Sequence, residues 1–177
     1  MTVHGHVVLQ ADEIRRALKR IAYEIIESNK GGADLILLGI PTRGAILAKR
    51  LAAAVNSIEA DSAVAGSLDV TMYRDDLGKQ PTRATHPTSI PAGGIDGKTV
   101  VLVDDVLMSG RTIRAALDAL AAIGRPKAVR LAVLIDRGHR ELPIRPDFVG
   151  KNLPSATTER IHVRLEEIDA FEEVTIL

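Results

Sequence analysis

Apolar residues recur at helical spacing near the beginning of the chain. Between residues 12 and 29 the apolar positions fall three or four residues apart, and Gly31-Gly32 follows them. This spacing places the apolar side chains on one face of an α-helix, and the two glycines are expected to end it. The same pattern predicts a second helix over residues 45–55 and a third over residues 112–123.

Short apolar runs alternate with these helices. The strands they predict lie at residues 35–40, 68–73, 100–103, 128–135, 161–165 and 174–177. Strands separated by helices predict an α/β fold with a mainly parallel, twisted sheet flanked by helices. Two long polar segments, residues 74–97 and 136–158, interrupt this pattern. Segments of that length are uncommon inside a compact domain unless they are functional or disordered.

The strand at residues 100–103 leads into the most informative part of the chain. Asp104 and Asp105 follow it, and the turn Ser109-Gly110-Arg111-Thr112 opens the next helix. Backbone N–H groups at such a turn favour a phosphate, at the sheet edge where α/β proteins bind ligands. The carboxylates can accept hydrogen bonds from sugar hydroxyls or approach a metal. One ligand with a phosphate and a polyol would satisfy both. The alternative is an ordinary capped helix, although a cap needs only one acceptor.

Two further polar segments follow predicted strands. In Thr42-Arg43-Gly44 a glycine allows close backbone approach and an arginine supplies a permanently charged donor fork, so an anion could bind there. A simple turn with a solvated arginine is the alternative reading. The charged run that begins at Tyr73-Arg74 opens the long polar segment, and such runs are usually solvated.

Composition narrows the classes of function. The 177 residues are enough for one domain with a substantial core. Lys plus Arg and Asp plus Glu both number 23, so the net charge gives no indication of a nucleic-acid partner. The absence of cysteine excludes disulfides, thiolate metal sites and a cysteine nucleophile. No membrane-spanning apolar run or signal-peptide pattern is present, so a cytoplasmic protein is expected.

Residues 100–112 resemble, at all thirteen positions, the phosphoribosyl-pyrophosphate signature of the type I phosphoribosyltransferases. That signature is a hydrophobic strand, two acids, a short variable stretch and Ser/Thr-Gly-x-Thr. Together with residues 39–44, 73–77 and 136–145, it is similar to the pyrimidine operon attenuation regulator family, and the similarity runs from residue 14 to about residue 165. Members of this family are bifunctional uracil phosphoribosyltransferases.

The resemblance implies that uracil and phosphoribosyl pyrophosphate give UMP and pyrophosphate, with Mg²⁺ held mainly through the substrate. Asp104 and Asp105 would hold the ribose hydroxyls and Arg74 would contact pyrophosphate, and these three are the candidate catalytic residues. Lys79 and Arg83 are weaker candidates for the pyrophosphate contact. The candidate substrate-binding residues are Thr42, Arg43, Gly44, Val106, Leu107, Met108, Ser109, Gly110, Arg111, Thr112, Arg137 and Ile161.

The resemblance also implies a type I phosphoribosyltransferase-like fold with special loops. A flexible loop at about residues 74–97 would close over pyrophosphate, and a hood at about residues 136–160 would cover the base. Purine enzymes of this kind carry an acid where this chain has Met108. A thioether cannot exchange a proton with a base nitrogen, which argues against a purine. Alternatively, Met108 only fills a gap.

A second role follows from the same resemblance. The protein would bind pyrimidine-operon leader RNA when UMP or UTP is bound, and it would form a homodimer or a higher assembly away from membranes. The predicted first helix carries Arg15, Arg16, Lys19 and Arg20, which could contact RNA phosphates. A solvated helix face explains these four residues equally well. A regulator with vestigial catalysis and a phosphoribosyltransferase for another base are the remaining alternatives.

Overall fold

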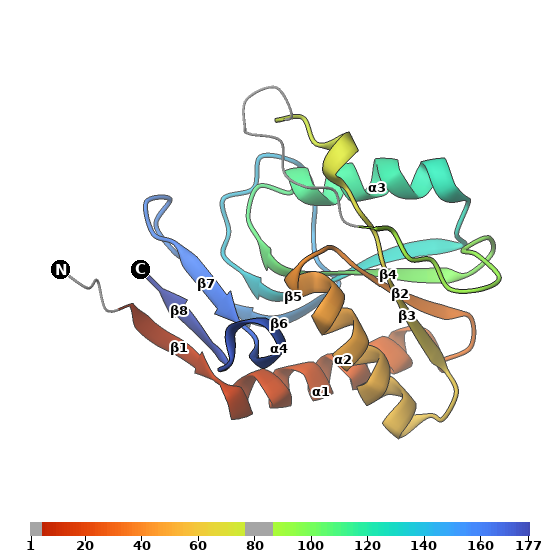
Figure 1. The fold of residues 1–177 in the computed structure, drawn as a ribbon, viewed down its shortest axis with the longest axis horizontal. Helices are drawn as coiled ribbons and strands as arrows, with labels where there is room; N and C mark the ends of the chain where they lie inside the picture. Colours follow the sequence, from red (N-terminus) through yellow and green to blue (C-terminus); the bar gives the residue numbers. More distant parts are fainter. Residues whose placement is uncertain (1–4, 77–86) are drawn as a thin grey trace.

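The structure is a computed structural model that describes residues 5–76 and 87–177. Its centre is a parallel sheet of five strands in the order β3-β2-β4-β5-β6 (Figure 1). These strands are β2 (Leu35–Gly39), β3 (Ala63–Ser67), β4 (Thr99–Leu107), β5 (Ala128–Asp136) and β6 (Phe148–Asn152). A smaller antiparallel sheet has the order β1-β8-β7 and consists of β1 (His6–Gln10), β7 (Ile161–Arg164) and β8 (Glu173–Ile176). The sheet is therefore mainly parallel, as predicted.

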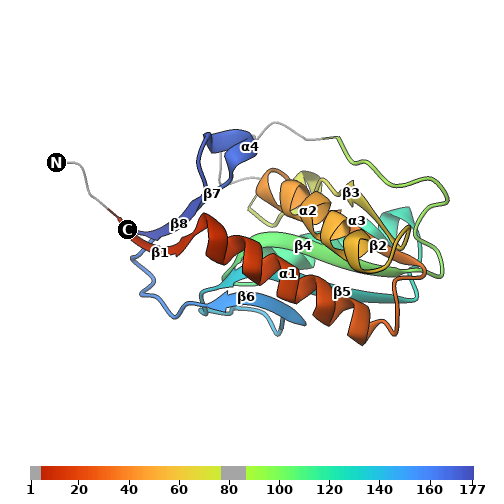
Figure 2. The same cartoon turned by 90° about the horizontal axis from the view of Figure 1, so that it is seen from below.

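Helices cover both faces of the parallel sheet. Helices α1 (Ala11–Ser28) and α2 (Arg43–Ile58) lie on one face, and α3 (Arg111–Ile123) lies on the other (Figures 1 and 2). In β2, Leu35 and Leu37 belong to the core beneath α1 and α2, whereas Ile36 and Leu38 belong to the core beneath α3. A strand covered on both faces needs apolar residues at every position, which explains its unbroken apolar run.

The first helix is stabilised by the burial of its apolar face and by a hydrogen bond at its first turn. Ile14, Leu18, Ile21 and Ile25 are buried on the side that meets the sheet. At the start of the helix the Glu13 carboxylate accepts a hydrogen bond from the backbone N–H of residue 10, at 2.8 Å. This contact satisfies one N–H group that the helix itself leaves without a partner. The predicted helix at residues 12–29 is confirmed. No helix among the described residues is long and apolar enough to cross a membrane.

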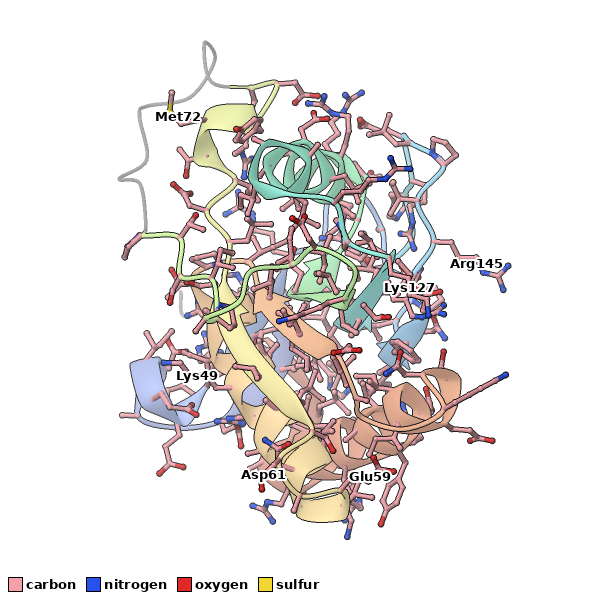
Figure 3. All side chains as sticks on the ribbon, turned by 90° about the vertical axis from the view of Figure 1, so that its right-hand side faces the viewer. Lys49, Glu59, Asp61, Met72, Lys127 and Arg145 are labelled. Carbon is pink, nitrogen blue, oxygen red and sulfur yellow. The ribbon has the colours of Figure 1, made fainter. Side chains whose placement is uncertain are left out.

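The strand predicted at residues 68–73 is wrong. The edge strand β3 lies just before it, and residues 71–73 form one turn of 3-10 helix, η1 (Thr71–Tyr73). The Asp69 carboxylate accepts hydrogen bonds from the backbone N–H and the hydroxyl of Thr71, which turns the chain. Leu68 and Val70 are buried, whereas Met72 is 69% exposed and points into solvent (Figure 3). The apolar residues of this segment are apolar because two of them are buried, and not because the segment pairs as a strand.

Two other boundaries differ from the prediction. Strand β4 continues to Leu107 because it stays paired with β5, so Asp104 and Asp105 lie inside the strand and not beyond its end. The second polar segment contains β6, which pairs in parallel with the outer side of β5. Its sequence includes Gly150 and Lys151, which are atypical of a buried strand. The open edge of β5 decides this pairing, and a local pattern does not reveal it. Strand β1 and the one-turn helix α4 (Glu166–Asp169) were not predicted either.

Candidate active site

The C-terminal ends of β2 and β4 open into a cavity of about 490 Å³. Its walls come from the loop between β2 and α2, the segment around η1, the end of β4 and the start of α3. The lining residues are Ile40, Pro41, Thr42, Arg43, Asp69, Val70, Thr71, Arg74, Asp104, Asp105, Val106 and Thr112. The structure therefore brings together the acids, the first polar loop and Arg74, which are separated by as much as 63 residues in the sequence.

The two acids form a closely linked pair at the cavity floor. Asp104 is only 8% exposed, whereas Asp105 is half-buried. The backbone N–H of Asp105 donates to Oδ1 of Asp104 at 2.9 Å, and the N–H of Val106 donates to Oδ1 of Asp105 at 2.8 Å. Burial, followed by the neighbouring Asp105 charge, raises the pKa of Asp104 well above its usual range. Two adjacent carboxylates in this environment favour a ligand that brings hydroxyl donors or positive charge.

The loop between β2 and α2 is pressed against the ends of the strands. The peptide bond between Pro41 and Thr42 is cis, and the Ile40 N–H donates to the Val103 carbonyl at 2.9 Å. A Cβ atom added to Gly44 would lie 2.5 Å from that carbonyl oxygen, closer than any normal contact. Only glycine therefore permits this approach, which places Thr42 and the start of α2 beside the acids.

The turn after β4, the predicted phosphate-binding loop, depends on a glycine. Gly110 has a φ of 91°, a left-handed conformation that glycine adopts readily, and the next residue begins α3. The Ser109 carbonyl accepts hydrogen bonds from the N–H groups of Glu141 and Leu142, at 2.9 and 3.1 Å. The segment after β5 thus rests directly on this loop.

The predicted members of this loop do not all face the cavity. Thr112 lines it, whereas Leu107 is buried in the core beneath α3 and can offer only its backbone. The Arg111 side chain turns outward, where it donates to Asp75 and to Glu141, both at 2.7 Å. It bridges the start of the long polar segment to the segment after β5.

Arg74 lines the cavity but already has a carboxylate partner. Its Nε and Nη2 donate to the two oxygens of Asp76, at 2.9 and 2.8 Å. This contact raises the pKa of Arg74, so the guanidinium carries its charge throughout the accessible pH range. A phosphate ligand would have to replace Asp76 or share the guanidinium with it. Lys79 and Arg83, the two weaker candidates, lie outside the described residues.

A second cavity, of about 320 Å³, lies under the predicted hood. It is lined by Asp136, Arg137, Gly138, His139, Asn152, Pro154 and Ser155. Arg137 is 7% exposed, and its Nη2 donates to the carbonyl oxygens of Ala156 and Glu159, both at 2.8 Å. It therefore holds the hood segment in place as well as lining the cavity. Ile161, at the start of β7, is not among the residues that line either of these two cavities.

Several residues around the site were not predicted from the sequence. Asp69 and Thr71 line the main cavity, but the predicted strand concealed their turn. Arg140 donates to the Met108 carbonyl at 3.0 Å and to Asp136 at 2.6 Å, and only the four-residue spacing of the latter pair could have indicated this. Asp169 accepts hydrogen bonds from Arg43 although 126 residues separate them, and nothing local in the sequence indicates that contact.

Comparisons with known proteins agree with this geometry. Residues 7–167 match the family model described as a phosphoribosyl transferase domain. A protein of Leifsonia xyli subsp. xyli named bifunctional protein PyrR is 66% identical, and the alignment covers 96% of this chain and 95% of that protein. One of the same name from Streptomyces coelicolor is 60% identical, with coverages of 96% and 88%.

Among solved structures, a hypoxanthine phosphoribosyl transferase of Trypanosoma cruzi superposes with a TM-score of 0.75. It is 17% identical and covers 100% of this chain and 93% of its own. A hypoxanthine phosphoribosyltransferase of Staphylococcus aureus gives a TM-score of 0.68 at 19% identity, with coverages of 96% and 90%. At such low identity these two structures speak for the fold alone, and the predicted type I phosphoribosyltransferase fold is confirmed.

Proposed function

The chain belongs to the phosphoribosyl transferase domain family and, within it, to the bifunctional PyrR proteins, and from this premise we propose that it transfers a phosphoribosyl group to uracil and regulates pyrimidine genes through RNA. The reaction would convert uracil and phosphoribosyl pyrophosphate into UMP and pyrophosphate. The observation that carries the proposal is the acid pair of buried Asp104 and half-buried Asp105, which lines one cavity together with Arg43 and with Thr112 at the start of α3.

Asp104 and Asp105 would bind the ribose hydroxyls and stabilise the reacting sugar. Breaking the bond between C1 and pyrophosphate leaves positive charge on the ring, in a transition state that resembles an oxocarbenium ion, by analogy with glycoside cleavage. Two neighbouring carboxylates attract that charge more strongly as it develops, so they stabilise the transition state more than the bound substrate. The burial of Asp104 strengthens this interaction, because little water screens it.

The other groups would bind and orient the substrate. The turn at residues 108–112 would hold the 5′-phosphate through backbone N–H groups and the Thr112 hydroxyl. Arg43 and Arg74, which both line the cavity, would neutralise the departing pyrophosphate. The polar segment at residues 74–97 would close over the site and exclude water, which would otherwise hydrolyse the activated sugar.

The donor set fits Mg²⁺ held mainly by the substrate. The described residues contain no group of three or more histidine, cysteine, aspartate or glutamate side chains placed to hold a metal. Asp104 and Asp105 supply hard oxygen ligands, and Mg²⁺ commonly takes one or two carboxylates and completes its shell with phosphate oxygens and water. When bound, the ion would neutralise pyrophosphate and make it a better leaving group.

Uracil-dependent turnover is the first prediction and the direct test. With phosphoribosyl pyrophosphate and Mg²⁺, uracil should release pyrophosphate and form UMP, whereas hypoxanthine and orotate should neither react nor compete strongly. Met108 offers no acid to a purine nitrogen, and its carbonyl is held by Arg140. The measurement is pyrophosphate release with each base. Turnover with hypoxanthine would indicate that the enzyme acts on a base other than uracil. UMP binding without any turnover would indicate a regulator with vestigial catalysis.

The RNA-binding part of the proposal rests on the exposed side of α1. Arg20 donates to the carbonyl oxygens of Val149 and Gly150, at 2.8 and 2.7 Å, so it fastens α1 to β6. Arg16 makes a solvent-exposed pair with Asp12, at 3.2 Å, which is a weak interaction. Arg15 and Lys19, like Arg16, are exposed and therefore open to phosphate groups.

Reversing two of these charges should weaken RNA binding without affecting catalysis. For Arg16→Glu plus Lys19→Glu, we expect the affinity for pyrimidine-operon leader RNA, measured with UMP present, to fall by at least tenfold. The slope of log affinity against log salt should drop by about one for each cation removed. Arg20 is left intact because its loss would disturb β6.

The matched control is Lys49→Glu plus Lys127→Glu, which changes the net charge equally on α2 and before β5 (Figure 3). Equal loss of RNA affinity in both double variants would mean that only overall charge matters. Loss of uracil turnover in a folded Arg16 and Lys19 variant would contradict the separation of the two surfaces.

The whole chain would act as one phosphoribosyltransferase domain, with the lid at residues 74–97 and the hood at residues 136–160. A cytoplasmic location and a homodimer or higher assembly complete the proposal. UMP and UTP would bind in the same cavity as the substrates. Their binding would make RNA binding depend on the pyrimidine nucleotide concentration.

A further inference from the structure

Arg43, the arginine of the loop between β2 and α2, is held by a carboxylate from the far end of the chain. Its Nη2 donates to both oxygens of Asp169, at 2.9 and 3.1 Å. The Arg43 side chain is 31% exposed and the Asp169 side chain is 19% exposed, so neither group is free in solvent. Arg43 lines the main cavity, whereas Asp169 does not. The carboxylate that holds Arg43 is therefore not itself part of the cavity lining.

Asp169 is itself firmly placed. Its Oδ2 accepts a hydrogen bond from the backbone N–H of Leu165 at 2.8 Å, and its own N–H donates to the Leu165 carbonyl at 2.8 Å. The Leu165 side chain is completely buried in the core beneath α1 and α2. The hydrogen bond from Leu165, followed by the contact with Arg43, lowers the pKa of Asp169, so it stays ionised at neutral pH. A fixed negative charge thus faces Arg43.

The helix that carries Asp169 is fastened to α2 at a second point. Arg50 lies two helical turns after Arg43 on the same side of α2, and it donates to Glu167 at 2.8 and 2.6 Å and also to Glu172. This second attachment holds α4 beside α2 independently of Arg43. None of the three residues in this second attachment lines the main cavity.

The guanidinium of Arg43 is left with unused donors. Its Nε is buried and has no hydrogen-bond partner among the described residues. A buried donor without an acceptor is unfavourable, so the unbound site leaves this part of the guanidinium unsatisfied. An arginine held at one nitrogen, with donors remaining for phosphate oxygens, has already lost the side-chain freedom that binding would otherwise remove.

We propose that Asp169 is a positioning residue that holds Arg43 in the conformation that binds the pyrophosphate group of the substrate. This inference rests on the proposed phosphoribosyltransferase function. Asp169 acts through Arg43 and touches no reacting atom, so its effect falls on binding. Pyrophosphate contacts Arg43 both before and during bond cleavage, and an interaction of that kind affects KM more than kcat.

Asp169→Asn tests the proposal with little change of shape. The amide oxygen can still accept from the Leu165 N–H, but the negative charge facing Arg43 is lost. The KM for phosphoribosyl pyrophosphate should rise about tenfold, while kcat and the KM for uracil stay within twofold. Calorimetric titration with pyrophosphate and Mg²⁺ should show a matching loss of affinity. Asp169→Glu should bind pyrophosphate more tightly than Asp169→Asn but less tightly than the wild type, because its longer side chain keeps the charge but shifts the carboxylate.

Glu167→Gln is the matched control. It removes a charge from the same helix and weakens the same attachment to α2, but it acts on Arg50 and leaves Arg43 untouched. An equal rise in KM for Glu167→Gln would show that α4 packing alone matters and would overturn the proposal. So would an unchanged or lower KM for Asp169→Asn, the lower value meaning that Asp169 competes with the ligand. If the wild-type protein does not turn over uracil, the proposed reaction fails, whereas the pyrophosphate titration still tests Asp169.

Discussion

Replacing both acids of the pair, Asp104→Asn plus Asp105→Asn, is expected to lower uracil turnover by about a thousandfold or more. Each amide keeps the shape of the side chain but removes the charge that attracts the developing cation on the ribose ring. The effect should fall mainly on kcat, because that charge develops only as the bond to pyrophosphate breaks. The measurement is pyrophosphate release under saturating uracil and phosphoribosyl pyrophosphate. Retention of more than a tenth of the activity would contradict the proposed role of the pair.

The same substitution at Asp104 alone should make the protein more stable at neutral pH. The folded-state pKa of Asp104 is raised above its ordinary value of 3.8, so the folded protein binds a proton that the unfolded chain has released. Stability contributed by this group is therefore lost as the pH rises from about 3.8 through the raised pKa. Asparagine does not titrate, so the stability of Asp104→Asn relative to wild type should increase over this window and then level off.

Thermal unfolding at pH 4 and pH 8 checks this expectation. The control is Asp118→Asn on α3, which removes an exposed carboxylate that pairs with Arg114 at 3.2 Å. Its effect on stability should be small at both pH values, since an exposed pair contributes little. A folded, more stable and inactive Asp104→Asn would mean that the site holds an unfavourable charge for function. Loss of activity through unfolding would contradict that interpretation.

Gly39→Ala is expected to be the most damaging single change near the arginine-bearing loop. A Cβ atom at this last position of β2 would lie 2.1 Å from the Gly44 carbonyl oxygen and 2.4 Å from the Ala45 Cα. Both are backbone atoms of the first turn of α2, so no side chain can move aside to relieve the clash. We expect a loss of about 3 kcal/mol in the free energy of unfolding.

The clash should also affect catalysis because it moves the loop that carries Arg43. A displacement of about 1 Å is enough to reduce turnover by about a hundredfold. The assay is done at a temperature where circular dichroism shows that the variant is folded. Gly31→Ala is the control, since Gly31 lies between α1 and β2 with a φ of 117°, and an added Cβ would be at an ordinary contact distance, 3.7 Å, from the Glu59 carboxylate. It should lose about 1 kcal/mol from backbone strain and keep its activity. Comparable inactivation of both variants would show that the steric argument is wrong.

The parts of the fold that were predicted correctly have local causes. The apolar residues of α1 recur at helical spacing within the helix itself, so a short stretch of sequence is enough to identify it. Strand β2 is apolar at every position before its terminal glycine because both of its faces are covered. The turn after β4 was predicted because its acids, glycine and threonine lie within a few residues of one another, and its binding of phosphate stays a prediction. Strand β6 could not be predicted in the same way. Its pairing depends on the free edge of β5, and its own residues are partly polar.

For the site, the sequence by itself determined the acid pair, the turn at residues 109–112 and the glycines around Arg43, together with the family to which these motifs belong. Their geometry follows from consecutive residues in a strand, a turn and the start of a helix, and such geometry depends little on distant parts of the chain. Only the tertiary structure decided which side chains are available to a ligand. In the folded protein Arg111 binds Asp75, Arg137 binds a carbonyl of the hood, Arg20 binds a carbonyl of β6, and Asp169 binds Arg43. Those choices depend on contacts between segments far apart in the sequence, because burial and charge at each position are set by neighbours that only folding brings together.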